Sequence, residues 1–131
     1  MPEFEDVRAC HAPASEVWKL LFDPTRFPEW WAGMDRVDQS SGTVTRYMSA
    51  WPDFAYPTQV TARTEDSRVV ISCMLSDIVH EWTLEPADTG CAVRVRIDVP
   101  EHESARLDAV AEETRESLIR LVALAESADA S

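Results

Sequence analysis

Basic side chains are scarce in this sequence, which has 12 lysines and arginines against 24 aspartates and glutamates and a formal net charge of −12. Nucleic acids and anionic membrane surfaces both bind clusters of lysine and arginine. We therefore expect no nucleic-acid partner. The negative charge favours solubility, and a neutral or apolar ligand suits it better than an anionic one.

Long apolar runs are also missing. No run approaches the roughly 18–20 residues that a membrane-spanning helix requires. Met1 is followed by Pro2 and Glu3, so the start has neither the basic segment nor the apolar core of a signal peptide. These absences predict a cytoplasmic protein that does not insert into a membrane.

Cysteine and histidine are few, at three each. They are Cys10, Cys73 and Cys91, and His11, His80 and His102. Their wide spacings match no zinc site or redox motif, and no glycine-rich phosphate loop is present. We predict buried, reduced thiols, with a reactive thiol as the alternative. Neither a metal nor another cofactor is expected.

What is present begins with a strand at 3–10 and two short helices. The first helix starts near Pro13 and has one apolar side, made of Val17, Trp18, Leu20 and Leu21. At Asp23-Pro24 a good N-cap precedes a good first helical residue, which predicts a second helix. Pro28 keeps that helix very short, and Gly33 ends the segment.

From Met34 to Pro100 the pattern is that of short strands. Turn signals at 40–42, 51–57, 65–67, 76–77 and 87–90 separate the runs. Two runs alternate clearly, with Ile78, His80, Trp82 and Leu84 on one face and then Val93, Val95, Ile97 and Val99 on one face. Short connections between the runs imply an antiparallel meander.

After Pro100 the pattern becomes helical over residues 101–126. An apolar stripe follows steps of three and four residues, through Leu107, Val110, Ala111, Thr114, Leu118, Leu121, Val122 and Ala125. The opposite face carries Asp108, Glu112, Glu113 and Glu116, which we expect to be solvent-exposed. Residues 126–131 are expected to form a frayed tail of a single domain spanning 1–131.

This order of elements predicts an α+β fold. A half-apolar antiparallel sheet needs a covering layer, and the long terminal helix is the element able to supply it. We therefore predict a helix-grip fold, in which a curved seven-stranded antiparallel sheet wraps around one long C-terminal helix. Two short helices follow the first strand.

The residues also carry a family resemblance. "APASEVWKLLFDPTRFPEWWAGM" (12–34) resembles the opening of the START-like (SRPBCC) superfamily, which includes polyketide cyclase and dehydrase-like proteins. "HEWTLEPADTGCAVRVRIDV" (80–99) resembles its last hairpin, and 101–126 its terminal helix. The resemblance implies a deep pocket between sheet and helix for an apolar or amphipathic small molecule. It implies no catalytic motif.

Meander topology suggests where such a pocket opens. Alternate connections lie at one end of the sheet, so those at 32–34, 51–57, 76–77 and 100–102 should meet there. "FPEWWAG" and "WPDFAYP" would then be neighbours, and they hold Phe27, Trp30, Trp31, Trp51, Phe54 and Tyr56. Adjacent helical residues point about 100° apart, so one of the two adjacent tryptophans should pack in the core. Which of them faces the cavity stays open.

The candidate ligand-binding set adds residues on the strands. It consists of Phe27, Trp30, Trp31, Met48, Trp51, Phe54, Tyr56, His80 and Trp82. His80 is the best candidate acid or base, with a hydrogen-bonded core role as the alternative. Tyr56 and Asp53 could exchange protons at the mouth. If Arg46 points inward with Val44 and Met48, it would orient a carboxylate or enolate.

Three functions remain open. The leading one is binding of a hydrophobic or aromatic, lipid- or polyketide-like ligand by a monomer or homodimer. The second is a polyketide aromatase, cyclase or dehydrase that works by acid–base chemistry without a metal. The third is a protein-partner module, which exposed apolar patches would favour. Two or more convergent polar groups in the cavity would favour the enzyme, and one polar anchor would favour the binder.

Overall fold

The computed structural model describes residues 3–40 and 43–130. Its strands are β1 (Glu3–Cys10), β2 (Met34–Ser40), β3 (Thr43–Met48), β4 (Trp51–Arg63), β5 (Arg68–Cys73), β6 (Val79–Ala87) and β7 (Gly90–Asp98). Its α-helices are α1 (Ala14–Leu21), α2 (Phe27–Trp30) and α3 (Leu107–Ala130). Three short 3₁₀ helices are η1 (Pro24–Arg26), η2 (Thr64–Asp66) and η3 (Glu101–Arg106).

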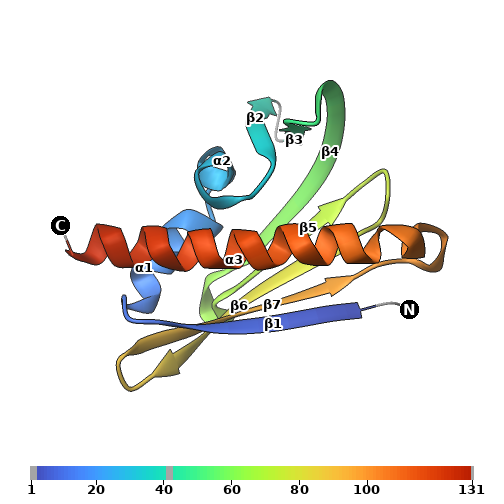
Figure 1. Ribbon diagram of the computed structural model, residues 1–131. Coiled ribbons are helices and arrows are strands. Elements are labelled where there is room, and N and C mark those ends of the chain that lie inside the picture. Colours follow the sequence, from blue (N-terminus) through green and yellow to red (C-terminus); the bar gives the residue numbers. More distant parts are fainter. Residues whose placement is uncertain (1–2, 41–42, 131) are drawn as a thin grey trace.

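The strands form one seven-stranded antiparallel sheet in the order β1-β7-β6-β5-β4-β3-β2. Helix α3 crosses the sheet, and α1 and α2 lie near the end of α3 that carries the C-terminus (Figure 1). The sheet curves so that β2, β3 and β4 rise beside the helix (Figure 1). This arrangement confirms the predicted helix-grip fold.

The segment 51–57 is not the connecting loop predicted from its prolines. It forms the first half of the long strand β4, and the turn before it consists of Ser49 and Ala50. Aromatic residues favour strands, and prolines are tolerated in a sheet near bulges and ends. The pairing of β3 with β4 has such an irregularity between Arg46 and Met48.

The terminal helix differs from the prediction at both ends. Residues 101–106 form η3 rather than the first turns of one continuous α-helix. Residues 126–130, expected as a frayed tail, continue α3 through Ala130, and Ser131 lies outside the described residues. The predicted apolar stripe is buried from Val110 to Ala125. Within the described chain, no helix is long and apolar enough to cross a membrane.

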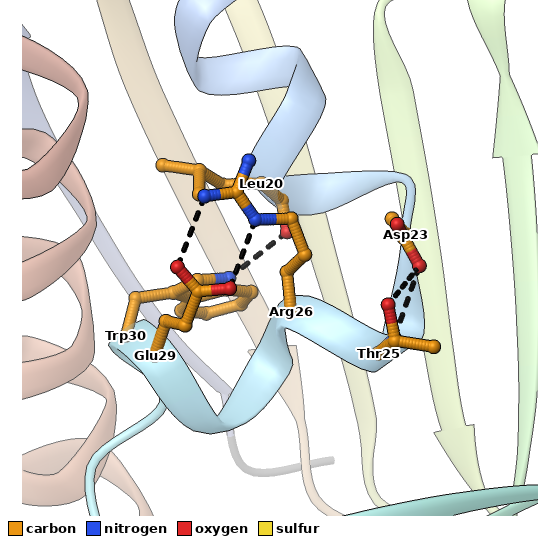
Figure 2. Close-up of polar contacts among 6 residues, drawn as sticks. All are labelled: Leu20, Asp23, Thr25, Arg26, Glu29 and Trp30. Carbon is orange, nitrogen blue, oxygen red and sulfur yellow. Dashed lines mark hydrogen bonds and ion pairs between the residues drawn. The ribbon is translucent and has the colours of Figure 1, made fainter. Parts of the chain in front are cut away.

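The end of the interior beneath α1 and α2 is filled. Trp30 is fully buried and its indole N–H donates to the backbone oxygen of Leu20 at 2.9 Å (Figure 2). Asp23 caps η1 by accepting from the backbone N–H and the hydroxyl of Thr25, as its position before Pro24 predicted (Figure 2). These contacts fix the short helical segment that carries Trp30 and Trp31.

Candidate functional site

A cavity of about 400 Å³ lies between the sheet and α3. Its lining residues are Gly33, Arg46, Met48, Ser49, Ala50, Trp51, Tyr56, Cys73, Ser76, Ile78, His80, Arg106, Ala109, Val110 and Glu113. They come from the α2–β2, β3–β4 and β5–β6 connections and from η3, as well as from strands and α3. The backbone N–H of Ser49 donates to the oxygen of Gly33 at 2.7 Å. The connections around 32–34 and 76–77 therefore meet at one end of the sheet, as predicted, but the β3–β4 connection beside them is Ser49-Ala50 rather than 51–57.

Trp31 lies behind the cavity wall and contacts residues that form it. Its ring lies edge-on to the ring of His80, with centroids 5.1 Å apart, and 4.9 Å from the guanidinium carbon of Arg46. The indole N–H donates to the carboxylate of Glu113 at 3.0 Å. Trp31 is itself buried. One tryptophan therefore touches three cavity-lining residues from β3, β6 and α3, which fixes their relative positions.

Arg46 points inward, as its position beside Val44 and Met48 suggested. It is only 8% exposed, and its Nε donates to the hydroxyl of Thr58 at 2.9 Å. Within residues 3–40 and 43–130, no carboxylate lies within 4.0 Å of it. Burial lowers the pKa of Arg46, although arginine stays protonated in proteins. The guanidinium is thus a buried cation that no carboxylate of the described residues contacts directly, although the charge of Glu113 acts on it.

His80 faces inward on β6, in agreement with the strand alternation. It is 6% exposed, and its Nε2 has no hydrogen-bond partner in the part of the chain that is described. Burial, followed by the charge of Arg46, lowers the pKa of His80 from 6.5 to about 3. The imidazole is therefore neutral near neutral pH, and its Nε2 is free to bond a ligand group.

Glu113 corrects the prediction of a fully solvent-exposed acidic face on the terminal helix. It lies on the same side of α3 as Val110 and Ser117, three and four residues away, so the edge of the stripe reaches it. Burial raises the pKa of Glu113, and the hydrogen bond from Trp31 and the charge of Arg46 oppose that rise. The helical spacing to Val110 was the signal in the sequence that could have identified it.

Cys73 also lines the cavity, at the end of β5. Burial raises the pKa of its thiol, but hydrogen bonds from Ser76 and Leu75 and the charge of Arg46 outweigh burial, so the net pKa is lowered. All three cysteines are buried and free, as predicted. Burial instead raises the pKa of Cys10, and raises that of Cys91 to about 11.

The aromatic candidates divide between cavity, core and surface. Trp51 and Tyr56 line the cavity, together with Met48. Phe27, Trp30 and Trp82 are instead fully buried in the hydrophobic core, which corrects their assignment to a binding wall. Their large rings fill the end of the interior under α1 and α2.

Phe54 and Asp53 lie outside the main cavity. Phe54 is 51% exposed and packs on the ring of Tyr56, with centroids 4.7 Å apart. Both residues border a shallower pocket next to Trp51. Both adjacent tryptophans belong to the buried core and neither lines the cavity, although Trp31 contacts three residues that do. Across the described residues, no group of three or more His, Cys, Asp or Glu could hold a metal ion.

Solved structures share this fold. The chain is similar to the di-domain ARO/CYC BexL from the BE-7585A biosynthetic pathway, with a TM-score of 0.79 and 20% identity over 96% of this chain and 47% of that one. The di-domain ARO/CYC StfQ from the steffimycin biosynthetic pathway gives 0.76 and 11%, over 98% and 52%. This chain thus spans about half of each di-domain protein.

The chain is also similar to a protein that it covers almost completely. CV1439 from Chromobacterium violaceum has a TM-score of 0.75 and 17% identity, and the match covers 96% of this chain and 99% of that one. No curated protein sequence matches the chain. A family model matches residues 1–126, and the chain therefore belongs to the family described as polyketide cyclase / dehydrase and lipid transport.

Proposed function

We propose that this chain binds an amphipathic, carbonyl-bearing small molecule of the polyketide kind and catalyses the proton transfers that cyclise or dehydrate it. Three polar side chains from three elements converge on one cavity, and this observation carries the proposal: Arg46 of β3, His80 of β6 and Glu113 of α3. A purely apolar carrier would gain nothing from them, because a polar group costs free energy to desolvate.

The size and the walls of the cavity suit such a molecule. Its volume of about 400 Å³ falls within the range of roughly 300–1,000 Å³ that small-molecule sites occupy. Met48, Ile78 and Val110 supply an apolar wall, and Trp51 and Tyr56 supply aromatic surface. An aromatic or alkyl portion would pack against these side chains while an oxygen atom reaches the polar groups.

Each polar group has a role that follows from its charge. The Arg46 guanidinium would stabilise negative charge on an enolate oxygen. Because its pKa is raised, the Glu113 carboxylate is a stronger base than an ordinary glutamate. It therefore suits removal of a proton next to a carbonyl, and the carboxyl group formed can give that proton to a leaving hydroxyl. Neutral His80 would accept a hydrogen bond from a substrate hydroxyl.

The resulting chemistry balances without a redox partner. Removal of the α-proton gives an enolate, whose carbon attacks a second carbonyl carbon of the same chain. The new alkoxide takes up a proton to become a hydroxyl group. Loss of that hydroxyl with a neighbouring proton releases water and leaves a carbon–carbon double bond. Positioning and proton transfer are all that the protein must supply.

The second candidate is binding without turnover. The family description includes lipid transport. Trp51 is 66% exposed at the cavity and Phe54 is 51% exposed next to it. Exposed aromatic surface of this kind is typical of a place where an apolar ligand enters or leaves.

Deuterium exchange into an aryl methyl ketone separates the two functions. A base that removes the α-hydrogens of this ketone in heavy water replaces them with deuterium, which proton NMR follows directly. We expect the wild-type chain to accelerate exchange and Glu113→Gln to lose most of that acceleration while still binding the ketone. Glu112→Gln is the matched control, because Glu112 is exposed and paired with Arg115.

The outcomes are distinct. Quenching of tryptophan fluorescence by the ketone without faster deuterium exchange would support binding without turnover. Absence of both quenching and exchange would contradict the proposed function. Equal exchange by Glu113→Gln and wild type would remove Glu113 from the proton transfer.

A further inference from the structure

Cys73 differs from the other two cysteines in its access to a ligand. It lines the cavity, whereas Cys10 and Cys91 face each other across β1 and β7 in the packed core. We propose that Cys73 is a nucleophile that forms a covalent thioether with α,β-unsaturated carbonyl ligands held in this cavity. This inference goes beyond the proposed cyclase or dehydrase function and needs no proton transfer by Glu113.

The turn after β5 brings Ser76 and the backbone of Leu75 near the thiol of Cys73. The backbone N–H of Cys73 donates to Ile78, and the backbone oxygen of Cys73 accepts from Asp77 at 2.9 Å, so both ends of the turn are fixed. Within it, Ser76 and the backbone of Leu75 lower the pKa of the Cys73 thiol, in opposition to burial. The Ser76 oxygen itself accepts from the N–H of Ile78 at 3.4 Å, which leaves its own hydrogen for the sulfur.

The surroundings of Cys73 offer a place for a carbonyl oxygen. Arg46 is only 8% exposed, lines the same cavity and has no carboxylate within 4.0 Å in the described part of the chain. The Nε2 of His80, also in the cavity wall, lacks a partner among these residues. A buried charge on Arg46 and an unpaired ring nitrogen on His80 at one cavity indicate that a polar group of a ligand binds there.

The bond-forming step is an addition of S–H across a double bond. The thiolate sulfur attacks the β-carbon of the ligand, and the electron pair of the carbon–carbon double bond moves to the carbonyl oxygen. Arg46 would stabilise the resulting enolate. A proton equivalent to the one lost by the thiol then reaches the α-carbon, so no oxidant or reductant takes part. A thiolate, rather than a thiol, performs such attacks.

Several contacts favour the thiolate of Cys73 over those of the other cysteines. Arg46 is the nearby cation, and its charge lowers the pKa of Cys73 together with the donors from Ser76 and Leu75. The titratable groups around the cavity are Arg46 of β3, Tyr56 of β4, His80 of β6, Arg106 of η3 and Glu113 of α3. Burial outweighs the hydrogen bonds that Cys10 receives and raises its pKa, and burial raises that of Cys91 to about 11, so both serve as internal controls.

The experiment treats the native full chain with 4-phenylbut-3-en-2-one, an aromatic enone, and follows adducts by intact mass spectrometry and peptide mapping. We expect one adduct per chain, on Cys73, while Cys10 and Cys91 stay unmodified. The urea-unfolded chain should react at all three cysteines, which shows that the reagent is competent. Cys73→Ala should form no adduct in the native state. A native chain that stays unmodified, or that reacts as fast at Cys10 or Cys91, would overturn the inference.

A second variant tests the activating contacts. Ser76→Ala removes the hydroxyl and should slow adduct formation several-fold, because the thiolate fraction near neutral pH falls as the pKa of Cys73 rises. Ser72→Ala is the matched control, since Ser72 lies on β5 with its side chain on the face opposite to Cys73. Equal rates for Ser76→Ala and wild type would contradict the assignment. Because exchange into a ketone reports Glu113 and alkylation reports Cys73, failure of one leaves the other measurable.

Discussion

The two ends of the interior between the sheet and α3 are filled differently. At the end beneath α1 and α2, Trp30 and Trp82 meet edge-on with ring centroids 5.2 Å apart, and Leu118 and Leu121 of α3 close the space. At the other end a cavity of about 400 Å³ remains, bordered by polar groups.

The side chains at the filled end favour stability, whereas those at the hollow end favour chemistry. Close-packed apolar side chains stabilise the fold through burial and dispersion. The buried charge of Arg46 and the orphaned ring nitrogen of His80 work against stability, because each has lost water without gaining a full set of partners. We infer that the filled end holds the protein together and that the hollow end retains groups whose benefit appears when a ligand binds.

The largest expected effect lies at the filled end. Leu118→Ala should lower the free energy of unfolding by about 2–5 kcal/mol, because it removes a fully buried side chain and leaves a void. Ile119→Ala, at the next position of α3 and 49% exposed, is the control and should be close to neutral. Urea unfolding measures both. Ligand binding per folded molecule should be the same in Leu118→Ala and wild type, and a near-neutral Leu118→Ala would contradict the comparison.

The second effect concerns His80 and acid. Its pKa is about 3 in the folded protein, against 6.5 ordinarily, so the unfolded chain takes up the proton first as pH falls. Stability due to neutral His80 is therefore complete above about pH 6.5 and is lost progressively toward pH 3. At about pH 4.5 the loss amounts to about 3 kcal/mol.

His80→Gln removes this dependence. The variant should lose less stability than wild type between about pH 6.5 and 4.5, as measured by urea unfolding at each pH. Glu113 has the opposite sign, because its raised pKa gives a contribution that is present at low pH and lost as pH rises. His102→Gln, at an exposed position in η3, is the control. Identical pH profiles for His80→Gln and wild type would show that residue 80 is not buried in a neutral form.

A smaller effect of opposite direction is expected for Arg46→Met. An apolar side chain of similar length avoids burying an unpaired charge, so the variant should be more stable by about 1–2 kcal/mol. It should also bind an aryl ketone about tenfold more weakly, because one charge-assisted hydrogen bond is worth about that factor. Arg36→Met is the control, since Arg36 is exposed and also lies over a tyrosine ring, that of Tyr47. Lower stability together with unchanged binding would assign Arg46 to structure alone.

Most of the fold could be predicted because apolar and polar residues alternate regularly along several of its strands. Val93, Val95 and Ile97 alternate with polar residues, and all three are fully buried. The first half of β4 could not be predicted in this way. Its prolines are turn signals by composition, while the actual turn, Ser49-Ala50, carries a weak signal.

The site was only partly predictable for a related reason. The alternation of side chains along a strand places Arg46 on the inner face of β3 and His80 on the inner face of β6. This alternation is visible without knowledge of any other element. The environments of Glu113 and Cys73 depend on contacts that no local pattern contains. Glu113 accepts a hydrogen bond from Trp31, 82 positions away, and the pKa of Cys73 depends on Ser76 and Leu75 of the following turn and on Arg46 of another strand.

The smallest change in stability is expected at the mouth of the hollow end. Trp51 is 66% exposed, so Trp51→Ala should alter the free energy of unfolding by no more than about 0.5 kcal/mol. Because Trp51 also lines the cavity, the variant should give a weaker change in tryptophan fluorescence when an apolar dye is added. Phe22→Ala removes another exposed aromatic ring, which packs on Trp18 of α1 away from the cavity, and should leave the response intact. A full response in Trp51→Ala would mean that the dye enters elsewhere, and the aromatic surface of β4 would then have no part in admitting a ligand.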